Sequence, residues 1–257
     1  MGVITTTAVL LRSYNYSETS KILRFFTRDH GVMAVIAKGE RRIHGRYGGS
    51  LETFVTGELT AYVRPTRDLQ TLKDFSATRP RRLLAGHVLR FAGASMLAEV
   101  VLEHSGEGPT PEIFGRLNHG LDAIEVVNES ELPATLLGEA WGLVADLGYH
   151  PVLDPCLQCG RPLEAGEMGR FDFGGGGVRC AHCAEAGEGP RLGPNARQQL
   201  RQMLAGDHSV QVSHPLAHLR LLEHFVTYHL AGSRPLKTFQ FLADLLERED
   251  SEPVEGM

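Results

Sequence analysis

The sequence has no long apolar stretch. None approaches the roughly 20 residues that a membrane-spanning helix needs. The N-terminus also lacks the pattern of a secretory signal, because the first basic residue is Arg12 and the apolar run 8–11 is too short. These absences predict a cytoplasmic protein with no membrane partner.

Sequence patterns of catalysis are missing as well. There is no Gly-x-Ser-x-Gly, no His-Glu-x-x-His and no dinucleotide-binding glycine fingerprint. The glycine-rich segment Phe173–Gly177 lacks the Gly-Lys-Ser/Thr ending of a phosphate loop, so we interpret it as the tip of a hairpin. Late histidines such as His224 and His229 are more typical of a packed helix than of a ligand set. We therefore expect that the protein is not an enzyme.

Cysteine is scarce, and all of it lies in one short segment. The four residues Cys156, Cys159, Cys180 and Cys183 follow the spacing C-x2-C-x20-C-x2-C. Four thiolates suit tetrahedral Zn²⁺, and two such pairs meet when the residues between them fold back as a hairpin. Gly160 supplies the backbone freedom that a tight turn beside a ligand requires. The spacing predicts one structural Zn²⁺ in a ribbon-like insertion.

Other readings of the cysteines remain open on the sequence alone. Two disulfides are unusual in a cytoplasmic chain, and free core thiols are unusual at this spacing. A catalytic zinc keeps three protein ligands and an open position, and His182 could then replace one cysteine. A zinc hydrolase or deaminase would also need the His-x-Glu partner that deaminases use, which the chain lacks.

Charge is divided unevenly along the chain. The net charge is -5, yet residues 1–82 hold 14 of the 26 Lys and Arg residues and seven of the 31 Asp and Glu residues. The balance is therefore +7 in this part and -12 in the remainder. Such asymmetry predicts a basic surface for a polyanion on an N-terminal domain.

A basic cluster at residues 38–46 concentrates that charge. Single-strand binders combine a positive groove with aromatic platforms for the bases. Tyr14, Tyr16, Phe25 and Phe26 lie among the basic residues, although Phe25 and Phe26 are adjacent in a predicted strand and at least one must face inward. The candidate DNA-binding residues are Arg12, Arg24, Lys38, Arg41, Arg42 and Arg46.

Hydrophobic patterning predicts an α+β protein of several domains. Five β-rich segments at 3–11, 21–27, 32–37, 51–63 and 69–75 favour a small barrel, with the OB-fold as the leading type. Helical spacing follows at 83–101, 111–127, 130–147, 195–204, 215–230 and 237–247, with Ser130 as a helix cap and Gly148 as a helix end. We expect an OB-fold at 1–79, a helical domain at 80–153 and 190–250, the zinc insertion at 154–189 and an acidic tail at 251–257.

The order of these parts resembles the RecO family of bacterial recombinational repair proteins. The segment "LLRSYNYSETSKILRFFTRDHGVMAVIAKGERR" is similar to the family's opening, above all in the element Lys38-Gly39-x-Arg41-Arg42. The segment "RPLKTFQFLADL" resembles its closing part. One departure is at Tyr16–Thr19, where many relatives have a glycine before the glutamate. The cysteines are missing in some relatives, so the metal supports the fold and not a shared activity.

The resemblance implies a function in DNA repair and homologous recombination. It implies binding of single- and double-stranded DNA, annealing of complementary strands and work with RecR that helps RecA replace single-strand-binding protein. It also implies contact with the acidic C-terminal tail of that protein, for which Arg220, Arg234 and Lys237 are weak candidates. The expected location is the cytoplasm, in association with the nucleoid. The alternative is a zinc-ribbon RNA-binding or transcription-associated adaptor, which would share the basic barrel but prefer RNA.

Overall fold

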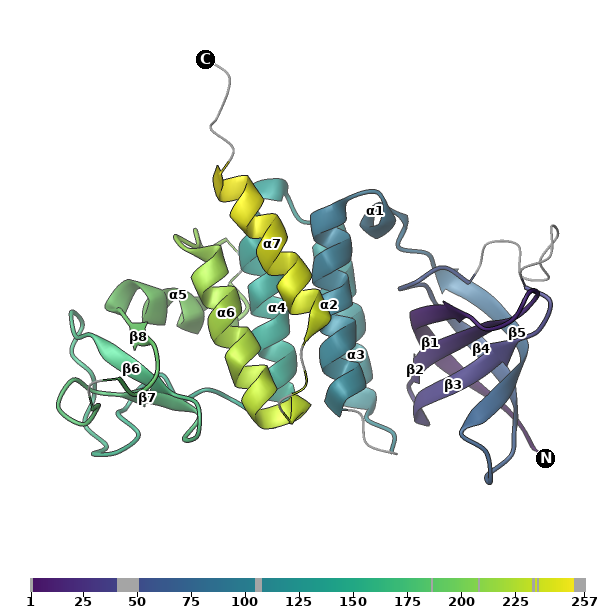
Figure 1. Ribbon diagram of the computed structural model, residues 1–257, viewed down its shortest axis with the longest axis horizontal. Coiled ribbons are helices and arrows are strands. Elements are labelled where there is room, and N and C mark those ends of the chain that lie inside the picture. Colours follow the sequence, from purple (N-terminus) through teal and green to yellow (C-terminus); the bar gives the residue numbers. More distant parts are fainter. Residues whose placement is uncertain are drawn as a thin grey trace, which may run out of the picture. The chain divides into compact units, whose positions relative to one another are not determined.

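The computed structural model describes residues 2–40, 51–104, 108–185, 187–207, 209–232, 234 and 236–251 (Figure 1). The chain divides into two compact units, and each is discontinuous in sequence. The first comprises Met1–His87 and Ser105–Glu125, and the second comprises Val88–His104 and Val126–Met257. Among the described residues, no helix is both long enough and apolar enough to cross a membrane.

Five strands of the first unit close into a barrel. They are β1 (Gly2–Asn15), β2 (Lys21–Thr27), β3 (Gly31–Ala37), β4 (Thr56–Val63) and β5 (Leu69–Arg79), in the order β1-β2-β3-β5-β4 (Figure 1). The pairing of β3 with β5 is parallel, and the other pairings are antiparallel. Alternate side chains such as Leu10, Phe25 and Leu59 fill the interior because successive strand residues face opposite sides. All five predicted strands are therefore present.

The segment before β4 differs from the prediction. Residues 51–55 were expected to start a strand, but β4 begins at Thr56. Leu51, Phe54 and Val55 are buried in a loop, and Phe54 adopts a φ of 71°. The Phe54 N–H donates to the Leu10 carbonyl at 2.7 Å, and the Leu10 N–H donates to the Val55 carbonyl at 3.0 Å. The apolar residues of this loop therefore cover the barrel core. A buried loop and a paired strand show the same pattern of apolar residues, so the sequence alone does not separate them.

A buried arginine fastens helix α3 (Pro111–Val126) to the barrel within the first unit. The Arg81 side chain is fully buried, and its Nε donates to Asp122 Oδ1 at 2.7 Å. Its Nη1 donates to the Phe54 carbonyl at 2.7 Å and to Thr56 Oγ1 at 2.9 Å, and its Nη2 donates to Asn118 Oδ1 at 3.0 Å. The barrel loop, the start of β4 and α3 are therefore joined by one guanidinium.

Helices dominate the second unit. They are α2 (Val88–His104), α4 (Leu132–Asp146), α5 (Pro194–Leu204), α6 (Pro215–Val226) and α7 (Lys237–Ser251), with short 3₁₀ and π segments η1 (Glu129–Glu131) and η2 (Thr227–Ala231). The rings of Trp141 on α4 and Phe225 on α6 pack 5.2 Å apart in the core. Helix α7 is tied to α2, because the Thr238 N–H donates to Glu99 Oε2 at 3.0 Å.

Several predicted helix boundaries need correction. The segment 83–101 is divided, since a separate short helix α1 (Arg82–Ala85) precedes α2. Ser130 does not cap α4; it lies inside η1, and the cap residue Glu131 makes no side-chain cap bond. Helix α6 ends at Val226 and continues as the π segment. The prediction for Gly148 is confirmed in place, because α4 ends at Asp146 and Gly148 has a φ of +97°.

The cysteine segment forms a small three-stranded sheet in the second unit. Its strands are β6 (Gly169–Asp172), β7 (Gly177–Arg179) and β8 (Arg191–Leu192), in the order β7-β6-β8 (Figure 1). The glycine run lies at the β6–β7 turn, which confirms its interpretation as a hairpin tip. Strand β8 carries the pairing to Leu192, three residues beyond position 189, where the insertion is predicted to end.

Arg81→Ala should destabilise the protein strongly. Removing the buried cation leaves the Phe54 carbonyl and the side chains of Thr56 and Asn118 without their donor and takes one of two cationic partners from Asp122, a loss of about 3–5 kcal/mol in the free energy of unfolding. Arg79→Ala is the matched control, because Arg79 also pairs with Asp122, at 2.8 Å, but its side chain is 59% exposed. Urea unfolding of both variants measures the difference. Equal and small losses would show that the buried pair does not hold α3.

Candidate metal centre and nucleic-acid interface

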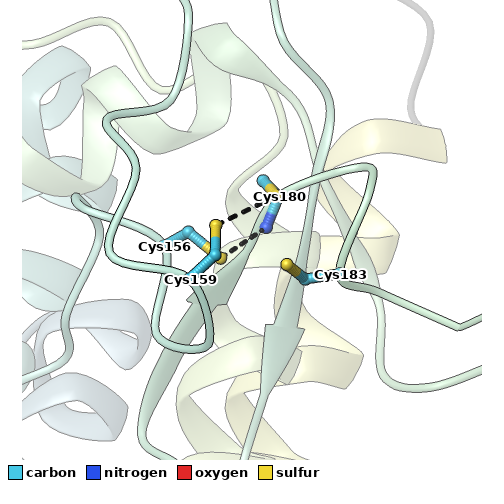
Figure 2. A group of neighbouring side chains, drawn as sticks. All are labelled: Cys156, Cys159, Cys180 and Cys183. Atoms are coloured by element: carbon cyan, nitrogen blue, oxygen red, sulfur yellow. Dashed lines mark hydrogen bonds between the residues drawn. The ribbon is translucent and has the colours of Figure 1, made fainter.

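Two tight turns bring the four cysteines together. The first turn carries Cys156 and Cys159, and the second carries Cys180, directly after β7, and Cys183. Their Sγ atoms all lie within 4.8 Å of one another (Figure 2). The first turn closes with the Gly160 N–H on the Cys156 carbonyl at 3.0 Å, where Gly160 has a φ of +70°. The second closes with the Cys183 N–H on the Cys180 carbonyl at 3.1 Å.

The electrostatics of the cluster favour thiolates beside a cation. Burial raises the pKa of Cys156, but N–H groups led by that of Cys159 outweigh it and lower the pKa to about 6. The Cys180 N–H donates to Cys156 Sγ at 3.2 Å (Figure 2). Hydrogen bonds to the neighbouring thiols, first Cys159 and then Cys180, raise the pKa of Cys183 to about 12. Four thiolates so close together need a positive ion, and soft thiolate donors fit a thiophilic metal.

The alternatives for the cysteines can now be compared with this geometry. The cysteines are free thiols, and the Sγ atoms of Cys159 and Cys180 are 3.9 Å apart. His182 is exposed and is not a member of the ligand group formed by the described residues. Four protein donors fill a tetrahedral site, which is typical of a structural and not a catalytic metal.

Glu167 joins the two cysteine turns, and the sequence analysis did not identify it. Its Oε1 accepts from Arg161 at 2.7 Å and from the Ala181 N–H at 3.1 Å. Burial raises the pKa of Cys180, but the N–H groups of His182 and Cys183 outweigh it and lower the pKa, with a smaller contribution from Arg161. Arg161, followed by N–H donors, lowers the pKa of Glu167 to about 2. The ion pair therefore contributes its full stability above pH 4.5, and this stability is lost as the pH falls toward 2.

A second arginine ties the ribbon to the helices of the same unit. Arg197 on α5 is 4% exposed, and its guanidinium donates to the main-chain carbonyls of Glu167 at 2.9 Å and Glu164 at 3.0 Å. Burial lowers the pKa of Arg197. The only sequence signal for this cluster is the opposite charge of Arg161 and Glu167 next to the first cysteine pair.

The basic residues predicted to bind DNA are only partly described. Arg12 on β1 and Arg24 on β2 are directly opposite each other, and both are half-buried. Lys38 is exposed, one residue beyond β3. Arg41, Arg42 and Arg46 lie outside the described residues. The structure therefore brings Arg12 and Arg24 together and leaves the rest of the predicted cluster untested.

Two further arginines extend the basic surface near Lys38. A cavity of about 330 Å³ is lined by Lys38, Tyr62, Arg64 and Arg67, among others. Arg64 and Arg67 lie in the turn between β4 and β5. The sequence analysis missed them because the two residues are separated from the cluster at 38–46 by a whole strand. The spacing Arg-Pro-Thr-Arg in a predicted turn was the available signal.

The aromatic residues divide between core and surface. The rings of Phe25 and Phe75 pack 5.1 Å apart in the barrel, and those of Phe26 and Phe114 pack 5.8 Å apart against α3. Both phenylalanines of β2 are therefore core residues and cannot stack on bases. Tyr14 and Tyr16 are 45% and 61% exposed, which leaves them available as platforms.

Two of the three basic residues predicted to bind the carboxylates of a partner's acidic tail already pair with acidic residues of this chain. Arg220 pairs with Glu247 at 2.5 Å, and Arg234 pairs with Glu103 at 3.3 Å. Lys237 is exposed at the start of α7. His229 stacks on Phe225 with ring centroids 4.5 Å apart, as expected for a packed residue.

Cys180→Ser should release the metal and destabilise the ribbon while leaving the barrel folded. A structural site converts metal affinity into folding free energy, so its loss unfolds the part that it closes. Metal content by mass spectrometry and limited proteolysis of residues 154–192 measure both effects. A variant that retains one metal ion per chain and resists protease as the parent does would contradict a four-thiolate structural site.

Glu167→Gln should weaken metal retention by about 10- to 100-fold, since it removes the charge that orients Arg161 beside Cys180. Glu188→Gln is the control, because Glu188 pairs with Arg179 at 2.9 Å on the same ribbon but at an exposed position. Competition with a chromogenic chelator gives both affinities. An equal effect of the two substitutions would assign Glu167 only a general charge effect.

Comparisons with known proteins agree with this architecture. The family model for the N-terminal part of recombination protein O matches residues 1–81, and the model for its C-terminal part matches residues 86–238. The DNA repair protein RecO of Anaeromyxobacter sp. (strain K) is 33% identical over 84% of this chain and 85% of its own length. That of Desulfatibacillum aliphaticivorans is 32% identical over 96% and 99%. The chain belongs to the RecO family of DNA repair and recombination proteins.

Proposed function

We propose that the protein is a recombination mediator that binds single- and double-stranded DNA and anneals complementary strands. The observation that carries this proposal is the direct opposition of Arg12 and Arg24 across β1 and β2. Two guanidinium groups so placed offer two neighbouring positive charges to the phosphates of a DNA backbone, and the positive balance of residues 1–82 supports the same ligand.

The barrel contacts the backbone and does not read the sequence of bases. Arg12, Arg24 and Lys38 neutralise phosphates, together with Arg41, Arg42 and Arg46, while the exposed Tyr14 and Tyr16 offer faces on which bases stack. Lys38, Arg64 and Arg67 continue this surface toward the turn between β4 and β5. Neutralised strands repel each other less, so complementary strands pair faster without any bond being made or broken by the protein.

The barrel is an OB-fold, and the metal is Zn²⁺. A five-stranded barrel in the order β1-β2-β3-β5-β4 supports the first assignment, since the OB-fold is a five-stranded Greek-key barrel that binds oligonucleotides. The four clustered thiols support the second. Bound Zn²⁺ would hold the two cysteine turns together, with Glu167 and Arg161 as supporting residues. We propose residues 1–79 as the DNA-binding domain, 80–153 and 190–250 as the helical domain, 154–189 as the zinc insertion and 251–257 as the tail. Within the helical domain, α3 belongs to the compact unit of the barrel.

The helical unit serves protein partners. The proposed partners are RecR, the acidic C-terminal tail of single-strand-binding protein and, indirectly, RecA, which is loaded where single-strand-binding protein is displaced. Membership in the RecO family supports this assignment. The protein works in the cytoplasm, at the nucleoid, as its DNA ligand requires.

The double substitution Arg24→Ala with Lys38→Ala should lower DNA affinity and reduce the salt slope of binding. Each lost phosphate contact reduces the slope by about one unit on a logarithmic scale, and affinity falls equally for all sequences. Arg28→Ala is the control, because Arg28 pairs with Asp29 in the turn between β2 and β3. Fluorescence anisotropy with single-stranded DNA, duplex DNA and RNA across a salt series, followed by a strand-annealing time course, measures these effects.

Unchanged affinity and slope in the double variant would remove these residues from the proposed surface. Binding of RNA in preference to DNA, without faster annealing, would overturn the mediator function and favour an RNA-binding adaptor.

A further inference from the structure

The cysteine cluster has a buried side and an open side. Cys156 and Cys180 are 2% and 0% exposed, whereas Cys183 is half-buried and Cys159 is exposed. A molecule in solution therefore has very different access to the four residues, although all their Sγ atoms lie within 4.8 Å of one another. Thiolates that bind a metal are also nucleophiles, and their reactivity depends on this access.

The open side lies at the tip of the first cysteine turn. Gln158, Cys159 and Gly160 are all exposed there. A Cβ atom on Gly160 would meet no heavy atom of the described residues within 4 Å beyond its chain neighbours, so the space next to Cys159 is open. Small reagents therefore reach Cys159 more readily than the other three cysteines.

The cluster also places a second sulfur beside the exposed one. Sγ of Cys159 and Sγ of Cys180 are 3.9 Å apart and join the two turns (Figure 2). An S–S bond is about 2 Å long, so the two atoms need to approach by roughly 2 Å, a distance that rotation of one exposed side chain covers. Sγ of Cys156 lies on the buried side and accepts the Cys180 N–H at 3.2 Å. Cys180 is therefore the thiol placed to react with an oxidised Cys159.

We propose that Cys159 is a modification site for hydroperoxides, that Cys180 resolves the product as a disulfide, and that the reaction releases the metal. The Cys159 thiolate attacks one oxygen of hydrogen peroxide, so that an S–O bond forms, the O–O bond breaks and hydroxide leaves. The Cys180 thiolate then attacks the sulfur of this sulfenic acid and displaces a second hydroxide. The two sulfurs lose two electrons in total, which reduce the peroxide to two hydroxide ions, and these take protons from the solvent.

Release of the metal follows from the loss of two thiolate donors. A disulfide sulfur carries no negative charge, so only Cys156 and Cys183 remain as thiolate ligands. Two donors do not fill a tetrahedral site, and Zn²⁺ has no redox chemistry that would compete for the peroxide. The reaction rests on the proposed binding of Zn²⁺ by the four thiols and not on DNA binding by the barrel, since residues 1–79 contain no cysteine.

The product keeps the two turns connected while the ion leaves. The new bond joins the same two turns that the four thiols bring together, because Cys159 belongs to the first and Cys180 to the second. Thiol reductants restore both thiolates, so the change is reversible as long as oxidation stops at the disulfide.

Oxidation of the full chain with graded amounts of hydrogen peroxide tests the proposal. Metal per chain is measured first by mass spectrometry, and release is then followed with a chromogenic chelator. Peptide mapping without reduction identifies the linked cysteines. We expect about one metal ion to be released for each peroxide consumed, with a link between Cys159 and Cys180. Dithiothreitol and added Zn²⁺ should restore the metal content.

Cys180→Ser and Cys183→Ser form a matched pair of variants. Each removes one thiolate from the second turn, so a general loss of metal binding is common to both. Peroxide should still link Cys159 to Cys180 in Cys183→Ser. In Cys180→Ser the sulfenic acid of Cys159 lacks its resolving thiol, and dimedone should label it at least about tenfold more than in Cys183→Ser.

Four results would overturn the proposal. They are a link within the first turn between Cys156 and Cys159, a link that omits Cys159, equal dimedone labelling of the two variants, and a metal ion that stays bound when Cys159 is oxidised. If neither variant folds, the link found in the parent chain decides the question. A chain that holds no metal before treatment would contradict the Zn²⁺ assignment and this proposal with it, whereas a full site that peroxide does not empty would contradict this proposal alone.

Discussion

The architecture of the first unit depends on the burial of one guanidinium. Arg81 cannot remain charged inside a protein without acceptors, and it obtains them from the loop before β4, from β4 itself and from α3. The chain therefore returns to the barrel at residues 111–125 after it has left to form α2. The DNA-binding surface proposed on β1 and β2 is the part of this barrel that Arg81 does not contact, so structure and ligand binding use different arginines.

In the ribbon, the buried charge that needs a partner has the opposite sign. There the charge to be balanced is negative where the four clustered thiols ionise, and N–H groups, Arg161 and a bound metal ion would balance it. Glu167 holds Arg161 in place, and Arg197 fixes the Glu167 main chain to α5. Arg197 therefore links the cysteine cluster to the helical part of the same unit.

Local patterns in the sequence predicted the elements well, and they failed where long-range contacts decide. The five strands, most of the helices and the four ligands follow from alternation, helical spacing and cysteine spacing. The loop 51–55 was taken for a strand because burial of Leu51 and Phe54 gives the same pattern as pairing. Arg81 could not be found because its partner Asp122 is 41 residues away in the sequence. Glu167 could not be found because its role depends on the fold bringing Arg161 and the Ala181 N–H to one carboxylate. Phe25 and Phe26 are both buried, because Phe25 packs on Phe75 inside the barrel and Phe26 packs on Phe114 of α3.

The π segment η2 has a consequence for the alignment of α6 with its neighbours. A π turn holds an extra residue relative to an α turn, so every side chain after it is rotated by about 100° around the helix axis. His229 lies inside this segment, and its ring centroid is 4.5 Å from that of Phe225 and 5.3 Å from that of Tyr149. Deleting one residue between 227 and 231 would restore regular winding and rotate the residues that follow the deletion by about 100°. The length of this segment therefore sets the direction in which the chain leaves α6.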